Sequence, residues 1–280
     1  MMKYLLSIFI MLLTCVHAIA ATERVSSPDG RIRLEVNTDD TLRMCMSYGD
    51  EQVLLNSPLC LQLQQEWLGV RPKVKSIRRK LINRQLVNVV PIKNVVTNDE
   101  AQQLTIAFAG NYSVEFRVYN NGVAYRFVID KKGKVDVTDE LMTLCFPSAT
   151  KAHISKTRSF WTSYEEPYTH LALADYKVQD DMSYLPVLME TARGTKLLLS
   201  ESDVRDYPAM FVKSTGNNGL TSIFPKAPAA WEPLGDRGFN VTSESPFIAR
   251  TEGKRSLPWR FLVIGDDKTI AANEMERVLG

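Results

Sequence analysis

The stretch YSVEFRVYNNGVAYRFVID, residues 112–130, carries the strongest hairpin signal in the chain. Its first part, Tyr112–Tyr119, alternates apolar and polar side chains, which is typical of a half-buried strand. Asn120-Asn121-Gly122 then supplies residues that tolerate positive φ and favour a tight turn between antiparallel strands. Residues 123–129 return as a second apolar-rich strand. We therefore predict an antiparallel hairpin here, within a fold built from strands.

Outward from this hairpin, short strands and turns continue in both directions. Residues 185–190 and 196–199 are expected to pair across Ala192-Arg193-Gly194, and residues 247–250 and 259–264 across Glu252-Gly253-Lys254. Many short strands without alternating helices predict an all-β fold, a large two-sheet antiparallel β-sandwich. One helix is expected at the end of the chain, within residues 266–280, where Asp266-Asp267 can cap it.

Composition excludes several classes of partner. The chain has 280 residues, 45% of them hydrophobic, which suits one large β domain over residues 21–265. The formal charge of +2 is small and evenly spread, so neither nucleic acid nor an anionic membrane is expected as a partner.

The first twenty residues have the pattern of an export signal. A positive start at Met1-Met2-Lys3 precedes an apolar segment, and Ala18-Ile19-Ala20 forms a small-residue cleavage site. Residues 1–20 are therefore predicted to be a signal peptide, and the mature protein to be exported and periplasmic. A lipoprotein that begins at a lipid-modified Cys15 is the alternative. No later apolar run has the length of a membrane span.

An acid follows a buried strand in LLLSESDVRDYPAMF, residues 197–211. Glu201 is placed where a β scaffold presents functional side chains, at the point where a strand meets a loop. A solvated surface acid is the alternative interpretation of Glu201. Asp206, Tyr207 and Pro208 are expected to form a loop that supports it, and Asp203 is a spare acid in the same loop.

Five motifs in order resemble the N-terminal domain of glycoside hydrolase family 97, a family of α-glucosidases and α-galactosidases. They are Ser27-Pro28-Asp29-Gly30, NGVAYRF (121–127), WTSYEEPY (161–168), the strand and acid of residues 197–211, and SLPWR (256–260). The resemblance implies a galactose-mutarotase-like sandwich, followed in the family by a (β/α)8 barrel that this chain lacks. It also implies that Glu201 helps to hold a Ca2+ ion whose other acidic ligands come from the barrel.

The WTSYEEPY segment contains candidates for sugar contact. Trp161, Tyr164 and Tyr168 are aromatic side chains close to Glu166, and such a combination suits sugars, whose C–H faces stack while hydroxyls form hydrogen bonds. The alternative is that the aromatic rings pack between sheets. Glu165 and Glu166 are not expected to be a catalytic pair, because neighbours on an extended chain point in opposite directions.

Three functions remain open from the sequence. The first is the N-terminal domain of a Ca2+-dependent hydrolase of α-linked oligosaccharides, with no catalytic residue of its own and no activity alone. The second is a free-standing carbohydrate-binding or interaction module. The third is a mutarotase-like epimerase, which needs a histidine acid beside a carboxylate, and only His153 or His170 could serve in the mature chain.

Overall fold

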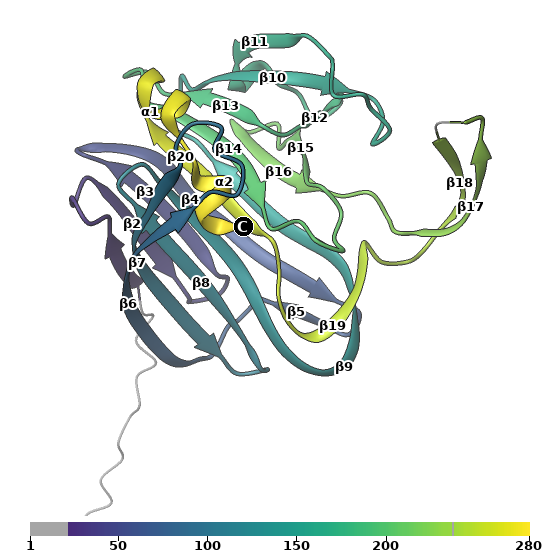
Figure 1. Ribbon diagram of the computed structural model, residues 1–280, viewed down its shortest axis with the longest axis horizontal. Helices are drawn as coiled ribbons and strands as arrows, with labels where there is room; N and C mark the ends of the chain where they lie inside the picture. The colour runs from purple at the N-terminus through teal and green to yellow at the C-terminus, as the bar shows by residue number, and fades with distance from the viewer. Residues whose placement is uncertain (1–21, 237) are drawn as a thin grey trace, which may run out of the picture.

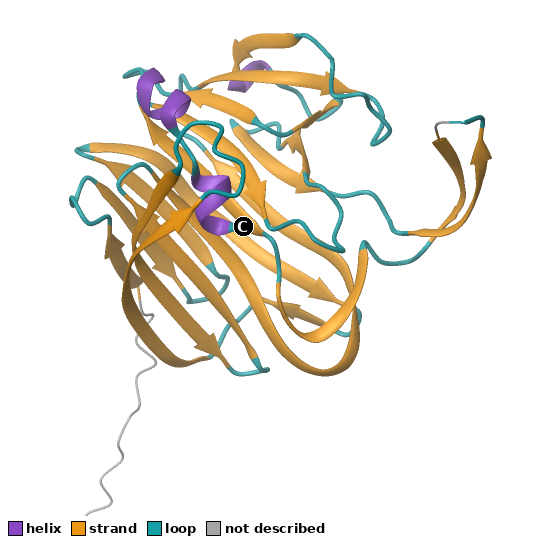
Figure 2. Cartoon of the chain, viewed as in Figure 1, coloured by secondary structure: helices purple, strands orange, loops and turns teal. Residues whose placement is uncertain are grey.

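The computed structural model describes residues 22–236 and 238–280 (Figure 1), so the predicted signal peptide lies outside the described residues. Strands dominate the fold and helices are few and short, as Figure 2 shows. The all-β prediction is thus confirmed. None of the helices in the described part of the chain has the length and apolar character that a bilayer crossing requires.

The strands follow one another with short connections. The first nine are β1 (Thr22–Ser26), β2 (Ile32–Asn37), β3 (Arg43–Tyr48), β4 (Glu51–Leu63), β5 (Glu66–Leu68), β6 (Val74–Val87), β7 (Val96–Phe108), β8 (Tyr112–Tyr119) and β9 (Gly122–Cys145). The next are β10 (Lys151–Thr157), β11 (Tyr168–Ala172), β12 (Met182–Tyr184), β13 (Val187–Glu190), β14 (Lys196–Ser202), β15 (Phe211–Ser214) and β16 (Gly219–Ile223). The last are β17 (Pro228–Leu234), β18 (Gly238–Glu244), β19 (Ala249–Ser256) and β20 (Trp259–Gly265). A 3-10 helix, η1 (Leu173–Asp175), follows β11, and the chain ends with α1 (Asp267–Ala272) and α2 (Met275–Leu279).

The antiparallel strands join differently from the two separate sheets that the sequence predicted. Apart from β17 and β18, they form one connected hydrogen-bonded network. The reason is the length of β9, whose successive segments pair with β8, β20, β19, β4 and β16. In Figure 1, β9 curves along the body of the molecule and links strands that would otherwise belong to separate layers.

Two of the three predicted hairpins are confirmed. β8 pairs with the first part of β9 from Tyr119↔Gly122 to Tyr112↔Ile129, and β13 pairs with β14. The third is wrong, because β19 and β20 do not pair with each other and each pairs with β9. Gly253 lies at a register shift of β19 rather than in a turn. A Cβ atom there would lie 2.5 Å from the carbonyl oxygen of Gly133, so this glycine permits close approach of β9.

The predicted C-terminal helix is present as two short helices. Asp266 caps α1 as expected, since its side chain accepts a hydrogen bond of 2.8 Å from the backbone N–H of Thr269. Asn273 then adopts an extended conformation, ends α1, and accepts a hydrogen bond from the backbone N–H of Met275. α2 buries Met275, Val278 and Leu279 against the body of the domain, and the partly buried Ile270 of α1 packs against the same cluster.

β17 and β18 form a separate hairpin that projects from the body of the molecule (Figure 1). Nearly all of its residues are exposed on both faces, including Trp231, Leu234 and Phe239. The main core lies elsewhere, among the buried apolar side chains of the connected network. The hairpin is therefore an arm beside the core rather than part of it.

Candidate functional site

Glu201 lies in β14 directly opposite Arg260 of β20. Its side chain is only 13% exposed, so the alternative of a solvated surface acid is wrong. Arg260 donates a hydrogen bond from Nη1 to Oε2 of Glu201. The backbone N–H of Met210, at the end of the loop after β14, also donates to both carboxylate oxygens, at 3.1 and 3.2 Å. Strand pairing and the returning loop together fix the position of this carboxylate.

Arg260 connects Glu201 to a second carboxylate in the interior. The guanidinium group is 1% exposed and donates from Nε and Nη2 to the two oxygens of Glu140, at 2.8 and 2.9 Å. Such a bidentate contact fixes both the position and the orientation of the arginine. The hydroxyl of Tyr207 donates to Oε2 of the same Glu140, at 2.9 Å. Tyr207 thus supports Glu201 through Glu140 and Arg260, which is a firmer role than the loop contact we expected.

This four-residue network, Glu140, Arg260, Glu201 and Tyr207, holds two carboxylates and one guanidinium. Burial raises the pKa of Glu201, and the opposing effects of Arg260 and the Met210 N–H offset this only in part. Burial also acts against the charge of Arg260, but the carboxylates of Glu140 and Glu201 outweigh it and raise the arginine pKa. With both acids ionised the network carries one surplus negative charge, which makes it attractive to a cation.

Glu201 is the predicted calcium ligand, and the oxygen atoms around it decide whether these residues fit a calcium ion. Ca2+ takes 6–8 oxygen ligands, and a carboxylate is its usual charged ligand. Within residues 22–236 and 238–280, no group of three or more His, Cys, Asp or Glu side chains is arranged to hold a metal ion. Glu201 has acceptor capacity left on Oε1, which receives only the Met210 N–H. Among the described residues, Glu201 is therefore a suitable ligand without the remainder of a calcium site around it.

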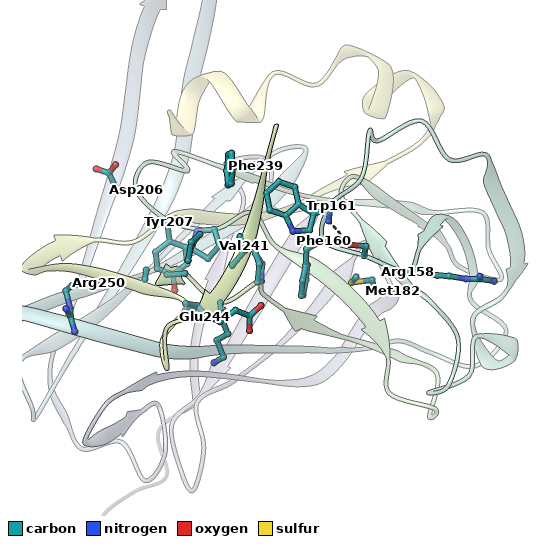
Figure 3. Close-up of a pocket in the computed structure, with 18 residues that line it drawn as sticks. Arg158, Phe160, Trp161, Met182, Asp206, Tyr207, Phe239, Val241, Glu244 and Arg250 are labelled. Carbon is teal, nitrogen blue, oxygen red and sulfur yellow. Dashed lines mark hydrogen bonds between the residues drawn. The ribbon is translucent and has the colours of Figure 1, made fainter. Parts of the chain in front are cut away.

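A pocket of about 700 Å³ lies beside this network, between the body of the domain and the β17–β18 hairpin (Figure 3). Tyr207 and Asp206 line it from the supporting loop, and Trp161 lines it from the segment before β11. Figure 3 shows Trp161 next to Phe239 of β18, and their ring centroids are 5.1 Å apart at an interplanar angle of 83°. The pocket thus combines aromatic rings with an acid from the supporting loop.

The other predicted sugar contacts do not share this pocket. Tyr164 packs edge to face on Tyr184, with ring centroids 4.8 Å apart. The backbone N–H of Glu166 donates to the Tyr184 hydroxyl, while the Glu166 side chain is exposed, as is Glu165. Tyr168 belongs to a different pocket. The aromatic segment therefore distributes its side chains over three places.

His153 and His170, the two histidines considered for epimerase chemistry, lie opposite each other on β10 and β11. Their Nδ1 atoms are 2.6 Å apart, and Nε2 of His153 is 4.0 Å from Glu190. Burial and the neighbouring His170 lower the pKa of His153, which favours its neutral form. Glu190 is held by Lys196 in an ion pair of 2.7 Å. A neutral histidine beside an already paired carboxylate is a weak acid–base pair for epimerase chemistry.

Sequence reasoning missed Glu140, Arg260 and Phe239. The sequence does contain an indication for Arg260, because this charged residue interrupts the apolar strand WRFLVIG (259–265). A charged side chain in a fully buried strand requires a partner. Nothing local to Glu140 or Phe239 indicated their roles, because the contacts that define them come from distant strands.

The architecture defines a large antiparallel β domain, and comparison with known proteins specifies its family. The family described as "Glycosyl-hydrolase 97 N-terminal" matches residues 25–280, and the chain belongs to this family. The chain is 29% identical to a protein named "Retaining alpha-galactosidase" from Bacteroides thetaiotaomicron. That alignment covers 91% of the chain but only 40% of the relative.

Solved structures agree with this assignment at the level of the fold. A glycoside hydrolase family 97 enzyme in complex with acarbose, from Pseudoalteromonas sp. strain K8, superposes with a TM-score of 0.72 at 21% identity. It is matched over 90% of this chain and 38% of its own. A beta-arabinopyranosidase superposes with a TM-score of 0.73 at 22% identity, over 87% of this chain and 40% of its own. The chain thus spans about two fifths of the length of these relatives.

Proposed function

We propose that this chain acts as the N-terminal domain of an exported, calcium-dependent hydrolase of α-linked oligosaccharides. The observation that carries the proposal is the family match over residues 25–280, combined with relatives that are more than twice as long. The catalytic acid and base belong to a barrel domain that follows this domain in the family. Within that arrangement the strand network is a galactose-mutarotase-like sandwich of two curved layers linked by β9.

In this proposal Glu201 supplies one calcium ligand, and the barrel supplies the remaining acids. Arg260, Glu140 and Tyr207 hold the Glu201 carboxylate in place, and the surplus negative charge of the network attracts the cation. Bound calcium would supply charge stabilisation and would orient the substrate. Trp161 would form part of the pocket wall, and the exposed Tyr164, Glu166 and Tyr168 would face substrate or barrel from their separate places beside it.

The chain alone is expected to release no p-nitrophenol from p-nitrophenyl α-galactoside or α-glucoside. The reason is that the pairs of carboxyl groups used by glycosidases face one gap of about 5–9.5 Å, and the catalytic pair lies in the barrel. Turnover that survives repurification and disappears with Glu165→Gln or Glu166→Gln would contradict the proposal, because the domain would then hold its own active site.

Export is the part of the proposal that rests on Ala18-Ile19-Ala20. Mass spectrometry of the protein recovered from the producing cells should show a mature chain that begins at Ala21 or Thr22. A chain that keeps Met1, or one that begins at a lipid-modified Cys15, would contradict a soluble periplasmic location.

A further inference from the structure

The β17–β18 hairpin exposes apolar side chains that its own fold does not cover. Trp231 packs on Phe239 with ring centroids 5.5 Å apart, and Phe239 is in turn in contact with Trp161. Trp161 and Phe239 remain 59% and 43% exposed. An isolated two-stranded hairpin is marginally stable in water, and clustered exposed aromatic rings mark a binding surface.

The pocket beneath these rings has an apolar floor. Phe160, Met182 and Ile248 line it from the body of the domain, and Pro208 lines it from the loop after β14. Its volume of about 700 Å³ is within the usual range for small-molecule sites. The two half-exposed aromatic rings stand at the side of this floor (Figure 3), where a flat apolar face of a ligand could lie against them.

The basic and acidic side chains that line the pocket differ in whether they have hydrogen-bond or ion-pair partners. Its basic side chains already have partners, since Arg158 pairs with Asp181, Arg250 with Asp136, and Lys226 with the carbonyl oxygen of Thr138. By contrast, the side chains of Asp206 and Glu244 make no hydrogen bond or ion pair with any other described residue. Ionised carboxylates only accept hydrogen bonds. The pocket therefore suits a ligand that donates hydrogen bonds and carries no negative charge.

We propose that this pocket binds a sugar unit of a neutral α-linked oligosaccharide. The C–H face of a pyranose ring would lie against Trp161 or Phe239, and its hydroxyl groups would donate to Asp206 and Glu244. This assignment deepens the proposed function and rests on it for the choice of sugar. It adds a binding position formed by the hairpin, separate from the calcium ligand Glu201.

A protein partner is the competing occupant of such a surface. The centre of a protein–protein interface is usually depleted of charged residues. Here two carboxylates that have no partner among the described residues line the same pocket as the aromatic rings, and burying them under an apolar protein surface would be unfavourable. A sugar suits both the aromatic rings, through its C–H face, and the two carboxylates, through its hydroxyl groups.

The test is a calorimetric titration of the purified chain with panose, an α-glucoside, and raffinose, an α-galactoside. We expect at least one to bind with a Kd near or below about 1 mM. Trp161→Ala and Phe239→Ala should each weaken binding about tenfold or more, and Glu244→Gln should weaken it without changing the fold. Trp67→Ala is the matched control, because Trp67 is a 44% exposed tryptophan outside the pocket, and it should change nothing.

Two results would overturn the assignment: no binding of either sugar by the correctly folded chain, or binding that Trp161→Ala and Phe239→Ala leave unaltered. Concentration-dependent self-association that Trp161→Ala abolishes, without sugar binding, would also overturn it and make the hairpin a protein interface. The experiment needs neither calcium nor a catalytic domain. Its failure is therefore distinguishable from a failure of the proposed hydrolase function, which is tested by turnover.

Discussion

Arg260→Leu is expected to destabilise the domain by about 3–5 kcal/mol, the usual result of removing one partner from a buried ion pair. Glu140 and Glu201 would then face each other without the guanidinium that separates and neutralises them. Tyr207 could still donate to Glu140, but one neutral hydrogen bond cannot replace a bidentate charged contact. The free energy of unfolding from urea titrations of the two proteins measures the effect.

Arg250→Leu is the matched control for this substitution. Arg250 also makes a bidentate contact, with Asp136, but its side chain is largely exposed. Surface ion pairs contribute about 0–1 kcal/mol, so this variant should stay close to the wild-type stability. Equal losses for the two arginine variants would mean that burial of the network does not govern its contribution.

Glu201→Gln is expected to have the largest effect on calcium. Consider a protein in which this chain is followed by the catalytic part of the Bacteroides thetaiotaomicron relative, called here the joined protein. Calcium at 100 times its Kd should stabilise the joined protein by about 2.7 kcal/mol. Outer ligand partners alone are worth about 10–100-fold in metal affinity, so loss of a charged ligand should cost at least as much. The shift in melting temperature with added calcium measures this.

In the chain alone, where calcium has only the Glu201 carboxylate to bind at this site, Glu201→Gln is expected to show its effect in the pH dependence of stability. The pKa of Glu201 is higher in the folded state than in the unfolded state. The favourable contribution of this side chain to the free energy of unfolding is therefore present below the unfolded pKa, and it is lost as pH rises through the folded pKa. Gln cannot ionise. The stability of Glu201→Gln relative to wild type should therefore improve as pH rises from acid to neutral, and a difference that is independent of pH would contradict the burial argument.

Local patterns predicted much of this fold. The hairpin of residues 112–130 formed as expected because alternation and turn residues act over a few neighbouring positions. The error at Glu252-Gly253-Lys254 has a physical reason, since a glycine that allows close packing and a glycine that allows a turn have the same sequence signal. The connection of the strands through β9 depends on long-range pairing, which no local pattern specifies.

The site was predicted less completely than the fold. Glu201 and Tyr207 were selected from a strand end and a Tyr-Pro turn, and both lie in the network. Glu140 is 61 positions before Glu201 in the sequence and joins it only through Arg260. Phe239 joins Trp161 in the same way, across the space between the hairpin and the body. Contacts of this kind become visible only when the chain is folded.

The central claim is that this domain completes a calcium-dependent active site with a following catalytic domain. It is tested most directly by the rate of p-nitrophenol release from p-nitrophenyl α-galactoside, measured for the chain alone and for the joined protein, with calcium and with EDTA. The account predicts no release by the chain alone, and release by the joined protein that calcium supports and EDTA abolishes. Release by the chain alone, or turnover by the joined protein that EDTA and Glu201→Gln both leave unchanged, would contradict it.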